Sequence, residues 1–348
     1  MKVRFEQLDG LKGLAIVIII ASHTAAFGMY GQGSIWADFF FVLGGFFCVI
    51  PLLKDGEEKF VGIKAFLSFY IKRIARIIFP YWICIIFFNW INGSLLKNKR
   101  DVIRSIFLIQ TSGHIWYIQH LMVGYFFVPF LMLLIYILKK NIKVTNLVVA
   151  LFLTVSSVFL CRYLFFASNL YLLWNEGNHR VVYSGLVILG MGIGYFYKSI
   201  NSNIKKHTYI ILDIFELLLI LFLTVITSHS FIILLFGNKY DSYIFGWNHP
   251  DICGVLGGLL VLIAAINDKG MCVKVISNKL FVFIGNISLE VYLIHYYLLD
   301  YFTMEAIPKF CIIIIISISV GYMMNKYMDN YIYKNVKKIL ENNMIDKN

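Results

Sequence analysis

Residues 8–23 read LDGLKGLAIVIIIASH, an apolar run with Asp9 and Lys12 near its front edge and Ser22 and His23 at its far end. In a helix, Lys12 and His23 are almost three whole turns apart, so both project from the same face. At 1.5 Å per residue they lie roughly 16 Å apart along that face. A cation and a titratable base at two depths of one face indicate a site for a long anionic ligand. Asp9 is expected to pair with Lys12 at i, i+3.

The composition around this stretch is typical of a polytopic helical membrane protein. Of the 348 residues, 60% are hydrophobic and 14% are charged, whereas a soluble chain would carry roughly a quarter charged residues. The mean hydropathy is +0.77, and the apolar residues come in long blocks between short polar breaks. The net charge of +12 more often records basic cytoplasmic loops than nucleic-acid binding in such a protein. No nucleic-acid partner is therefore expected.

Ten membrane spans are predicted, with both termini in the cytoplasm. Of the 31 Lys and Arg residues, we assign 22 to one side and 8 to the other, with Lys12 at the edge of the first span. The more basic side is expected to face the cytoplasm. A single membrane-embedded domain accounts for residues 1–348, with a core of about 8–326 and a short cytoplasmic tail over 327–348. The predicted spans are about 8–28, 34–53, 76–91, 115–138, 144–166, 180–197, 208–228, 252–267, 280–301 and 307–326.

The cysteines do not indicate a disulfide framework or a metal site. All six are scattered singly, and none forms a C-x-x-C pair, so no metal is expected. The first hydrophobic run lacks a convincing small-residue cleavage pattern, which favours a retained helix over a signal peptide.

A second basic feature is the R-x-x-R pair of Arg73 and Arg76, which share a helix face. One interpretation is an anchor whose side chains reach anionic lipid. The other is a phosphate clamp, because guanidinium groups bind phosphate bidentately. The pair alone does not decide between the two.

Two glycine-rich stretches favour close helix packing. Gly44 and Gly45 interrupt the aromatic run FFFVLGGFF, where they allow another backbone or a slender ligand to approach. Gly190, Gly192 and Gly194 superficially resemble a nucleotide-binding loop. They lie inside an apolar span with no strand before them, so helix packing is the better interpretation.

Two histidines are the candidates for chemistry inside the membrane. His23 lies deep in its span, which is costly unless the side chain faces a polar cavity or a partner; a packing role with a bond to nearby backbone is the alternative. His295 follows Ser288 by seven residues on the same face, and both are expected to line a cavity. His120 is expected to lie solvated near an interface.

In chain order, these motifs resemble the membrane-bound acyltransferase-3 family, which O-acylates cell-surface glycans and related acceptors. The resemblance covers nearly the whole length and lies in LDGLKGLAIVIIIASH, FFFVLGGFF, the R-x-x-R pair, HIWYI continuing through Pro129, and IGNISLEVYLIH. It implies that the histidine of the first span is the catalytic candidate and that the basic residues serve an acyl-CoA donor. Lys12 stands where many members have Arg. Leu121 stands where many have Glu, which points to the stand-alone branch without an extracytoplasmic esterase-like domain.

We therefore expect an all-α plasma-membrane O-acyltransferase that moves an acyl group, expected to be acetyl, from acyl-CoA to a hydroxyl of a surface polysaccharide or glycolipid. His23 would be the general base, because imidazole titrates near neutral pH, or would form an acyl intermediate. Lys12, Arg73 and Arg76 would bind the donor phosphates. Two alternatives stay open, a transporter or flippase of glycan or lipid and a catalytically silent assembly subunit. The expected supporting residues are Asp9, Trp116, Tyr117, Ser288 and His295.

Overall fold

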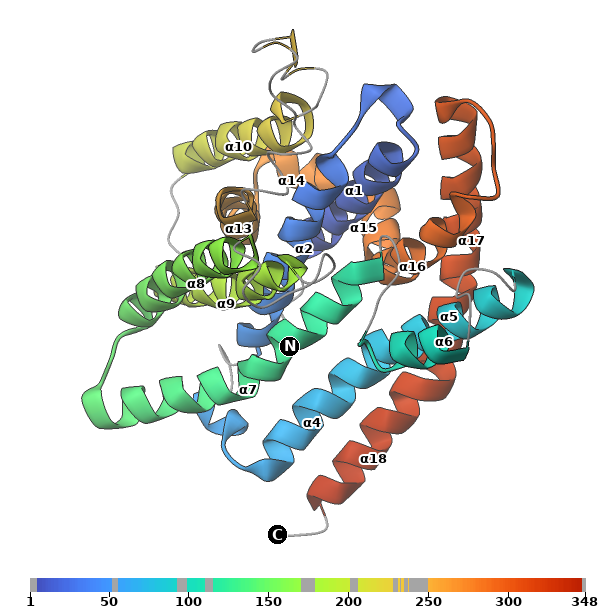
Figure 1. The fold of residues 1–348 in the computed structure, drawn as a ribbon. Coiled ribbons are helices and arrows are strands. Elements are labelled where there is room, and N and C mark those ends of the chain that lie inside the picture. Colours follow the sequence, from blue (N-terminus) through green and yellow to red (C-terminus); the bar gives the residue numbers. More distant parts are fainter. Residues whose placement is uncertain are drawn as a thin grey trace.

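The computed structural model describes residues 5–51, 56–92, 99–109, 115–169, 179–200, 206–227, 231, 233–234, 237 and 250–345. Every regular element within these ranges is a helix (Figure 1). The helices, with η marking 3₁₀ and π turns, are α1 (Glu6–His23), η1 (Ala26–Gly28), α2 (Gln32–Val49), η2 (Glu57–Phe60), α4 (Ile63–Arg73), η3 (Ile74–Ile78), α5 (Phe79–Asn92), α6 (Lys99–Ile106), α7 (Trp116–Ile142), α8 (Asn146–Asn169), η5 (His179–Ser184), α9 (Gly185–Ser199), α10 (Lys206–Leu221), η6 (Phe222–Ile226), α13 (Pro250–Ile266), α14 (Met271–Ile276), α15 (Lys279–Asn286), α16 (Ser288–Leu298), α17 (Ala306–Met328), η7 (Asp329–Tyr333) and α18 (Lys334–Ile345).

Each of the ten predicted spans falls on a helix or on consecutive helices. Within the described residues, five helices are long and apolar enough to cross a membrane, and α15 with α16 makes a sixth if that pair, bent by 74°, is one span. The helical class of the prediction is confirmed. The count of ten spans and the cytoplasmic placement of both termini stay predictions.

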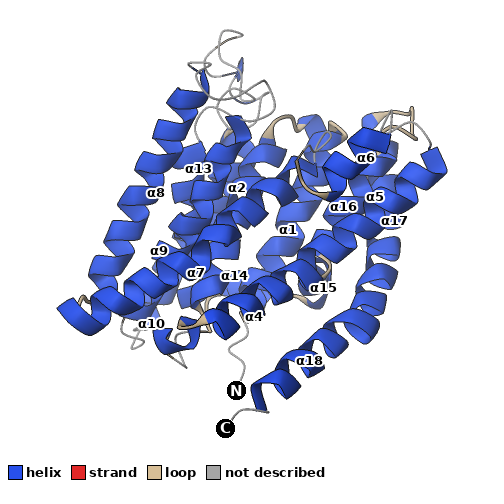
Figure 2. Cartoon of the chain, turned by 60° about the horizontal axis from the view of Figure 1, so that its bottom comes forward, coloured by secondary structure: helices blue, strands red, loops and turns tan. Residues whose placement is uncertain are grey.

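The core is organised around α1, which packs against α2 and α15 (Figure 2). Glycines allow these helix backbones to approach closely. A Cβ on Gly13 would collide with the carbonyl of Phe281 in α15, and one on Gly190 of α9 would collide with the carbonyl of Val42 in α2. The predicted packing role of the Gly190 run is therefore confirmed, and α1 and α2 are held at fixed rotations about their axes.

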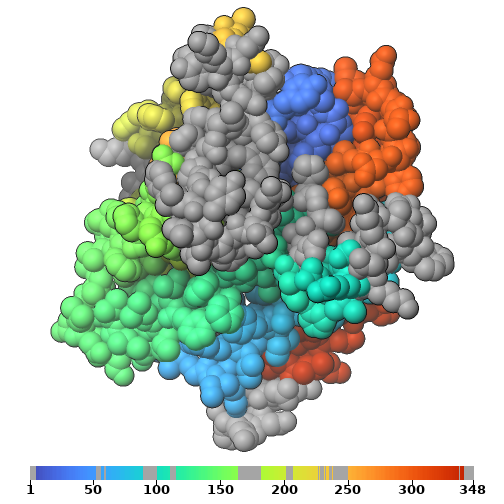
Figure 3. Space-filling model, in the orientation of Figure 1, coloured from blue at the N-terminus to red at the C-terminus, as the bar shows by residue number. Residues whose placement is uncertain are grey.

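The outer face of the bundle is strongly apolar. Phe126, Phe127 and Phe130 of α7 are exposed, as are Phe152 and Phe159 of α8. In Figure 3 the green segment that contains α7 forms part of this outer surface. Large exposed apolar faces on many helices are what lipid contact requires.

The segment between α2 and α4 is tied to two other helices through Glu57. Its Oε1 accepts a hydrogen bond from Lys139 Nζ at 2.5 Å and lies 3.5 Å from Lys198 Nζ. Burial alone would raise the pKa of the Glu57 carboxyl, but the hydrogen bond and charge of Lys139 outweigh it, so this pKa is lowered. Glu57 therefore joins the ends of α7 and α9 as an anion.

The C-terminal residues beyond the predicted core continue as helix. α17 passes through the π turn η7 into α18, and Asp329 and Tyr333 of η7 contact Arg76 of the π turn η3. The predicted tail thus packs on the basic segment after α4.

Candidate active site

Two cavities lie end to end along α1. The first, which we call the cationic cavity, has a volume of about 190 Å³ and contains the three predicted donor-binding cations. α1, α2, η3, α7 and α16 all contribute to its wall. Its lining residues include Lys12, Ile19, Ala37, Gly44, Arg73, Arg76, Tyr117, Leu121, Tyr125, Asn286, Ser288 and Tyr292.

Lys12 enters the cationic cavity from the first turns of α1. Its Nζ lies 2.7 Å from Asp9 Oδ1, which confirms the predicted i, i+3 pair. The same ammonium lies 5.7 Å from the centre of the Phe47 ring. The carboxylate and the ring hold the cation at one end of the cavity, where a phosphate would compete with Asp9 for it.

Arg73 is held by aromatic rings. Its guanidinium carbon lies 4.5 Å from the centre of the Tyr125 ring and 5.2 Å from that of Phe69. One of its nitrogens donates to Cys48 Sγ at 3.2 Å. Stacking of this kind fixes the plane of a guanidinium, so Arg73 presents its remaining N–H groups in a set direction.

Arg76 is the more exposed of the two arginines, with 44% of its side chain accessible. It lies 3.6 Å from Asp329 Oδ1, and its guanidinium carbon lies 4.9 Å from the centre of the Tyr333 ring. A third contact, 3.5 Å long, reaches the carbonyl of Asn286. Arg76 thus connects the cationic cavity to the C-terminal helix.

The second cavity, which we call the histidine cavity, has a volume of about 240 Å³. None of its described lining residues carries a fixed charge. Three residues, Ile19, Ala37 and Tyr292, line both cavities. The remaining lining residues of the histidine cavity are Ser22, His23, Tyr30, Gly31, Gly33, Ser34 and Trp116.

His23 is paired with His295. Nδ1 of His23 lies 2.9 Å from Nε2 of His295, and the rings stack with centres 5.2 Å apart. Nδ1 of His295 lies 2.6 Å from the carbonyl of Tyr292. A carbonyl only accepts hydrogen bonds, so in neutral rings Nδ1 of His295 carries the proton, and its Nε2 accepts from Nδ1 of His23. Nε2 of His23 is then the basic atom of the pair.

The turn after His23 directs this nitrogen toward the cavity. A Cβ on Gly33 would lie 3.0 Å from Nε2 of His23, so only glycine leaves normal space there. The Gly33 amide donates to Ser22 Oγ at 3.1 Å. Ala25 and Phe27, with φ of 57° and 56°, adopt the left-handed region that such residues rarely occupy. In this strained turn the Phe27 ring packs edge to face against Phe310, with ring centres 5.5 Å apart.

Most of the predicted site residues line one of the two cavities, while Asp9 and His295 line neither. Tyr117 and Ser288 line the cationic cavity with the three cations, whereas Trp116 lines the histidine cavity with His23. His295 is fully buried and reaches the site through His23. These positions bring the predicted residues together without testing their roles.

Sequence reasoning was wrong about His120 and did not name Tyr125 among the site residues. His120 is buried, with Nδ1 2.7 Å from the carbonyl of Trp116, because α7 turns that side chain into the bundle. The Tyr125 ring stacks on the guanidinium of Arg73. Two signals in the sequence could have found it: its place in the motif that runs from HIWYI through Pro129, and its spacing of eight residues after Tyr117 on the same helix face.

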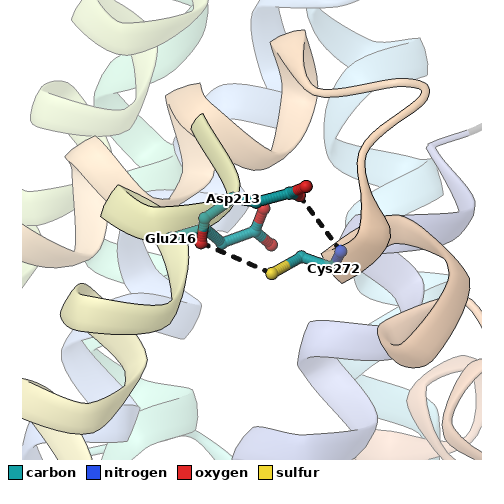
Figure 4. Close-up of side chains that lie close together, drawn as sticks. All are labelled: Asp213, Glu216 and Cys272. Carbon is teal, nitrogen blue, oxygen red and sulfur yellow. Dashed lines mark hydrogen bonds between the residues drawn. The ribbon is translucent and has the colours of Figure 1, made fainter. Parts of the chain in front are cut away.

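A separate polar cluster joins α10 to α14. Asp213, Glu216 and Cys272 offer ligand atoms within 4.8 Å of one another, a spacing that could hold a metal ion. Asp213 accepts the backbone N–H of Met271 at 2.7 Å and that of Cys272 at 3.0 Å. Figure 4 shows the contact with Cys272. The Asn267 amide lies 2.9 Å from Asp213 and 3.1 Å from Glu216. Because N–H groups already point at these carboxylates, we interpret the cluster as a cap on α14. The expectation of no metal stays a prediction.

Comparisons with known proteins converge on one family. A family model described as "Acyltransferase domain" matches residues 5–326. A provisionally named O-acetyltransferase of Staphylococcus aureus (strain COL) is 25% identical over 90% of this chain and 54% of its own length. The peptidoglycan O-acetyltransferase OatA of Listeria monocytogenes is 33% identical over 32% of this chain and 18% of its own length. The chain spans about half the length of the S. aureus relative. No solved structure matches significantly.

Proposed function

The chain belongs to the acyltransferase-3 family, and from this premise we propose that it transfers an acetyl group from acetyl-CoA to a hydroxyl of a cell-surface polysaccharide or glycolipid. That it is an acyltransferase follows from the family and from its relatives' names. One observation supports the remaining parts of the proposal, the donor and the acceptor. The cationic cavity and the histidine cavity share a wall, so an anionic donor in the first would have its reactive end beside the second.

The chemistry of the cationic cavity supports a donor with phosphate groups. Lys12, Arg73 and Arg76 all line it, together with apolar and aromatic side chains. Charges interact more strongly in such surroundings than in water, and guanidinium binds phosphate in a bidentate manner. The predicted cytoplasmic entry of CoA agrees with the placement of Lys12 near the start of α1.

His23 would act as the general base in the transfer. The acceptor hydroxyl oxygen attacks the thioester carbonyl as its proton passes to Nε2 of His23. The C–O bond then forms, the C–S bond breaks, and the proton moves to the leaving CoA thiolate. His295 would hold the reacting tautomer of His23 and stabilise the imidazolium, because its Nε2 accepts the hydrogen bond that Nδ1 of His23 donates.

The acceptor is proposed to be a carbohydrate hydroxyl at the plasma membrane. The histidine cavity presents the rings of Tyr30 and Trp116 with the hydroxyls of Ser22 and Ser34, a combination that can stack on a sugar and bond to its hydroxyls. The name of the Listeria relative refers to peptidoglycan, which supports a glycan acceptor here. Assignment to the stand-alone branch stays a prediction.

The test compares the unaltered chain with His23→Gln in membranes of cells that supply the acceptor. We expect the unaltered chain to release CoA thiol from acetyl-CoA and to add acetyl mass to surface glycans. His23→Gln should insert normally and lose a factor of about 10²–10⁴ in turnover, because an amide cannot take up the proton.

A chain that inserts but releases no thiol would contradict the acyl-CoA donor. Near-normal turnover by His23→Gln would instead show that His23 has a packing role and is not the general base.

A further inference from the structure

The cationic cavity is too small to contain a whole CoA donor. CoA consists of a thioester arm, a diphosphate, and an adenosine with a separate phosphate on its 3′ oxygen. The cavity has a volume of about 190 Å³, below the roughly 300–1,000 Å³ of typical small-molecule sites. Its cations can account for the diphosphate, and the arm would extend toward His23. Under the proposed function, the adenosine end of the donor must therefore lie against another part of the molecule.

A third cavity, which we call the C-terminal cavity, follows one face of α17, η7 and α18. Its volume is about 500 Å³, more than that of either cavity along α1. Its lining residues begin at Tyr322 and end at Lys334, at positions i, i+3, i+4, i+7, i+8, i+11 and i+12. This spacing is that of a single helix face. A stripe of this length suits an elongated ligand.

Arg76 joins the C-terminal cavity to the cationic cavity. Its side chain lines the cationic cavity. It also lies 3.6 Å from Asp329 Oδ1, and its guanidinium carbon lies 4.9 Å from the centre of the Tyr333 ring. Asp329 and Tyr333 both line the C-terminal cavity, and the Tyr333 hydroxyl donates to the carbonyl of Arg76 at 3.3 Å. A ligand with a phosphate at Arg76 thus has a second cavity within reach.

The C-terminal cavity has an excess of positive charge. Asp329 is the only carboxylate among its lining residues, and it is paired with Arg76. Lys334 Nζ donates to the neutral side chain of Asn330 at 3.0 Å. The charges of Lys326 and Lys334 are therefore not balanced by the lining. A phosphate monoester carries about −1.5 to −2 charges near neutral pH, which would balance them.

We propose that the C-terminal cavity binds the adenosine end of the donor, with Lys326 and Lys334 on its 3′-phosphate. Lysine binds phosphate as a point charge. The Tyr322 ring, 45% exposed, would stack on the adenine, as aromatic side chains do with bases. This inference rests on the proposed function and extends it, because it gives the 3′-phosphate a place separate from the diphosphate.

An anionic lipid head group offers the same phosphate chemistry to these lysines. The position of Arg76 favours the donor, because Arg76 joins the C-terminal cavity to the one proposed to hold the diphosphate. The experiments below separate the two sources of phosphate.

The first experiment compares acetyl-CoA with acetyl-3′-dephospho-CoA, which lacks only the phosphate in question. Release of the thiol is measured for the full chain in membranes that contain the native acceptor. The unaltered chain should have a KM for the dephosphorylated donor about tenfold or more above that for acetyl-CoA, the effect of losing a hydrogen bond between charged groups. Equal KM values for the two donors would overturn the proposal.

A double variant tests whether the two lysines account for this preference. Lys326→Gln/Lys334→Gln should raise the KM for acetyl-CoA about tenfold or more and leave the KM for the dephosphorylated donor nearly unchanged, so that the two donors become equivalent. Lys274→Gln is the matched control, because Lys274 is exposed on α14 and lines none of the three cavities. It also removes a positive charge, yet should keep the preference of the unaltered chain.

A binding measurement requires no turnover. Adenosine 3′,5′-bisphosphate should bind the purified unaltered chain about tenfold or more tightly than adenosine 5′-phosphate, and the double variant should remove the difference. Equal binding of the two nucleotides by the unaltered chain would overturn the proposal.

Two further outcomes would contradict the site while leaving the proposed acyl transfer intact. A preference for the 3′-phosphate that persists in the double variant would place its binding elsewhere. If that variant also became dependent on the anionic lipid content of the membrane, the lysines would be assigned to lipid head groups. Failure of the unaltered chain to release thiol from either donor would instead contradict the proposed function and, with it, this inference.

Discussion

At the scale of single residues, two histidines from opposite ends of the sequence share one hydrogen bond. His295 is fully buried, and an imidazole inside a membrane protein is costly unless both of its nitrogens have partners. Its partners are the Tyr292 carbonyl and Nδ1 of His23. The same two contacts that satisfy His295 leave the basic nitrogen of His23 on the side of Gly33.

Removing the accepting nitrogen of His295 should impair catalysis more than binding. His295→Leu is expected to lower kcat by roughly 10–100-fold, by analogy with the partners that orient metal-bound histidines. The KM for acetyl-CoA should change little, because His295 lines neither cavity. His295→Gln should recover part of the loss, since its amide oxygen can accept from Nδ1 of His23. Steady-state kinetics of both variants provide the measurement, and equal losses in the two would contradict an accepting role.

Arg73 should not be replaceable by lysine. Its guanidinium lies over the Tyr125 ring and bonds to Cys48, a planar arrangement that an ammonium cannot reproduce. Arg73→Lys and Arg73→Gln are both expected to raise the KM for acetyl-CoA by about 10-fold or more, with kcat less affected.

The comparison for Arg73 is Lys72→Gln, which removes a charge from the exposed neighbouring position. If Arg73 served only as a lipid anchor, insertion would fall while the KM of the inserted fraction stayed constant.

At the scale of helices, the contact between α2 and α9 depends on glycine. Gly190 faces the backbone carbonyl of Val42, which cannot move aside without moving α2. Because α2 carries Gly33 and Ala37, its position also sets the shape of both cavities. Helix packing and site geometry are therefore coupled through one backbone contact.

Gly190→Ala is expected to destabilise the fold by about 1–3 kcal/mol through overpacking. Gly258→Ala is the matched change, because its new Cβ would lie 3.2 Å from Cγ1 of the Ile193 side chain rather than against backbone. Thermal unfolding in detergent should show a lower Tm for Gly190→Ala than for Gly258→Ala. The same Tm for both would show that α2 and α9 separate easily.

At the scale of the whole molecule, the basic residues predict an orientation. The ten predicted spans assign 22 Lys and Arg residues to one side and 8 to the other, so the N-terminal side of α1 should face the cytoplasm. The cationic cavity would then open toward the side where CoA is made, and the histidine cavity toward the side where surface glycans lie.

Reporter fusions test this orientation. A reporter after Asn348 should give a cytoplasmic signal, and one after Gly31, in the turn between α1 and α2, should give the opposite signal. A third reporter after Glu57, beyond α2, serves as the control and should agree with Asn348. The same signal at Gly31 and Asn348 would rule out the ten-span arrangement.

The features that the sequence determined by itself are local ones. Apolar blocks and helical periodicity were enough to predict the helices, the common face of Lys12 and His23, and the pairing of Asp9 with Lys12. The family could also be identified, because its motifs are short and recur in a set order. These properties depend on residues within a few turns of one another, where the geometry of a helix is known in advance.

The site itself was decided by tertiary structure. Periodicity shows which residues share a helix face but not which helix that face meets, so the contact of His23 with His295 could not be derived. The same limit applies to Ser288 and His295, which were predicted to share one helix face. Ser288, the first residue of α16, lines the cationic cavity, whereas His295 contacts His23. The wall that the two cavities share arises only when α1, α2 and α16 meet. Its existence depends on helix rotation and on packing between distant segments, which no local pattern specifies.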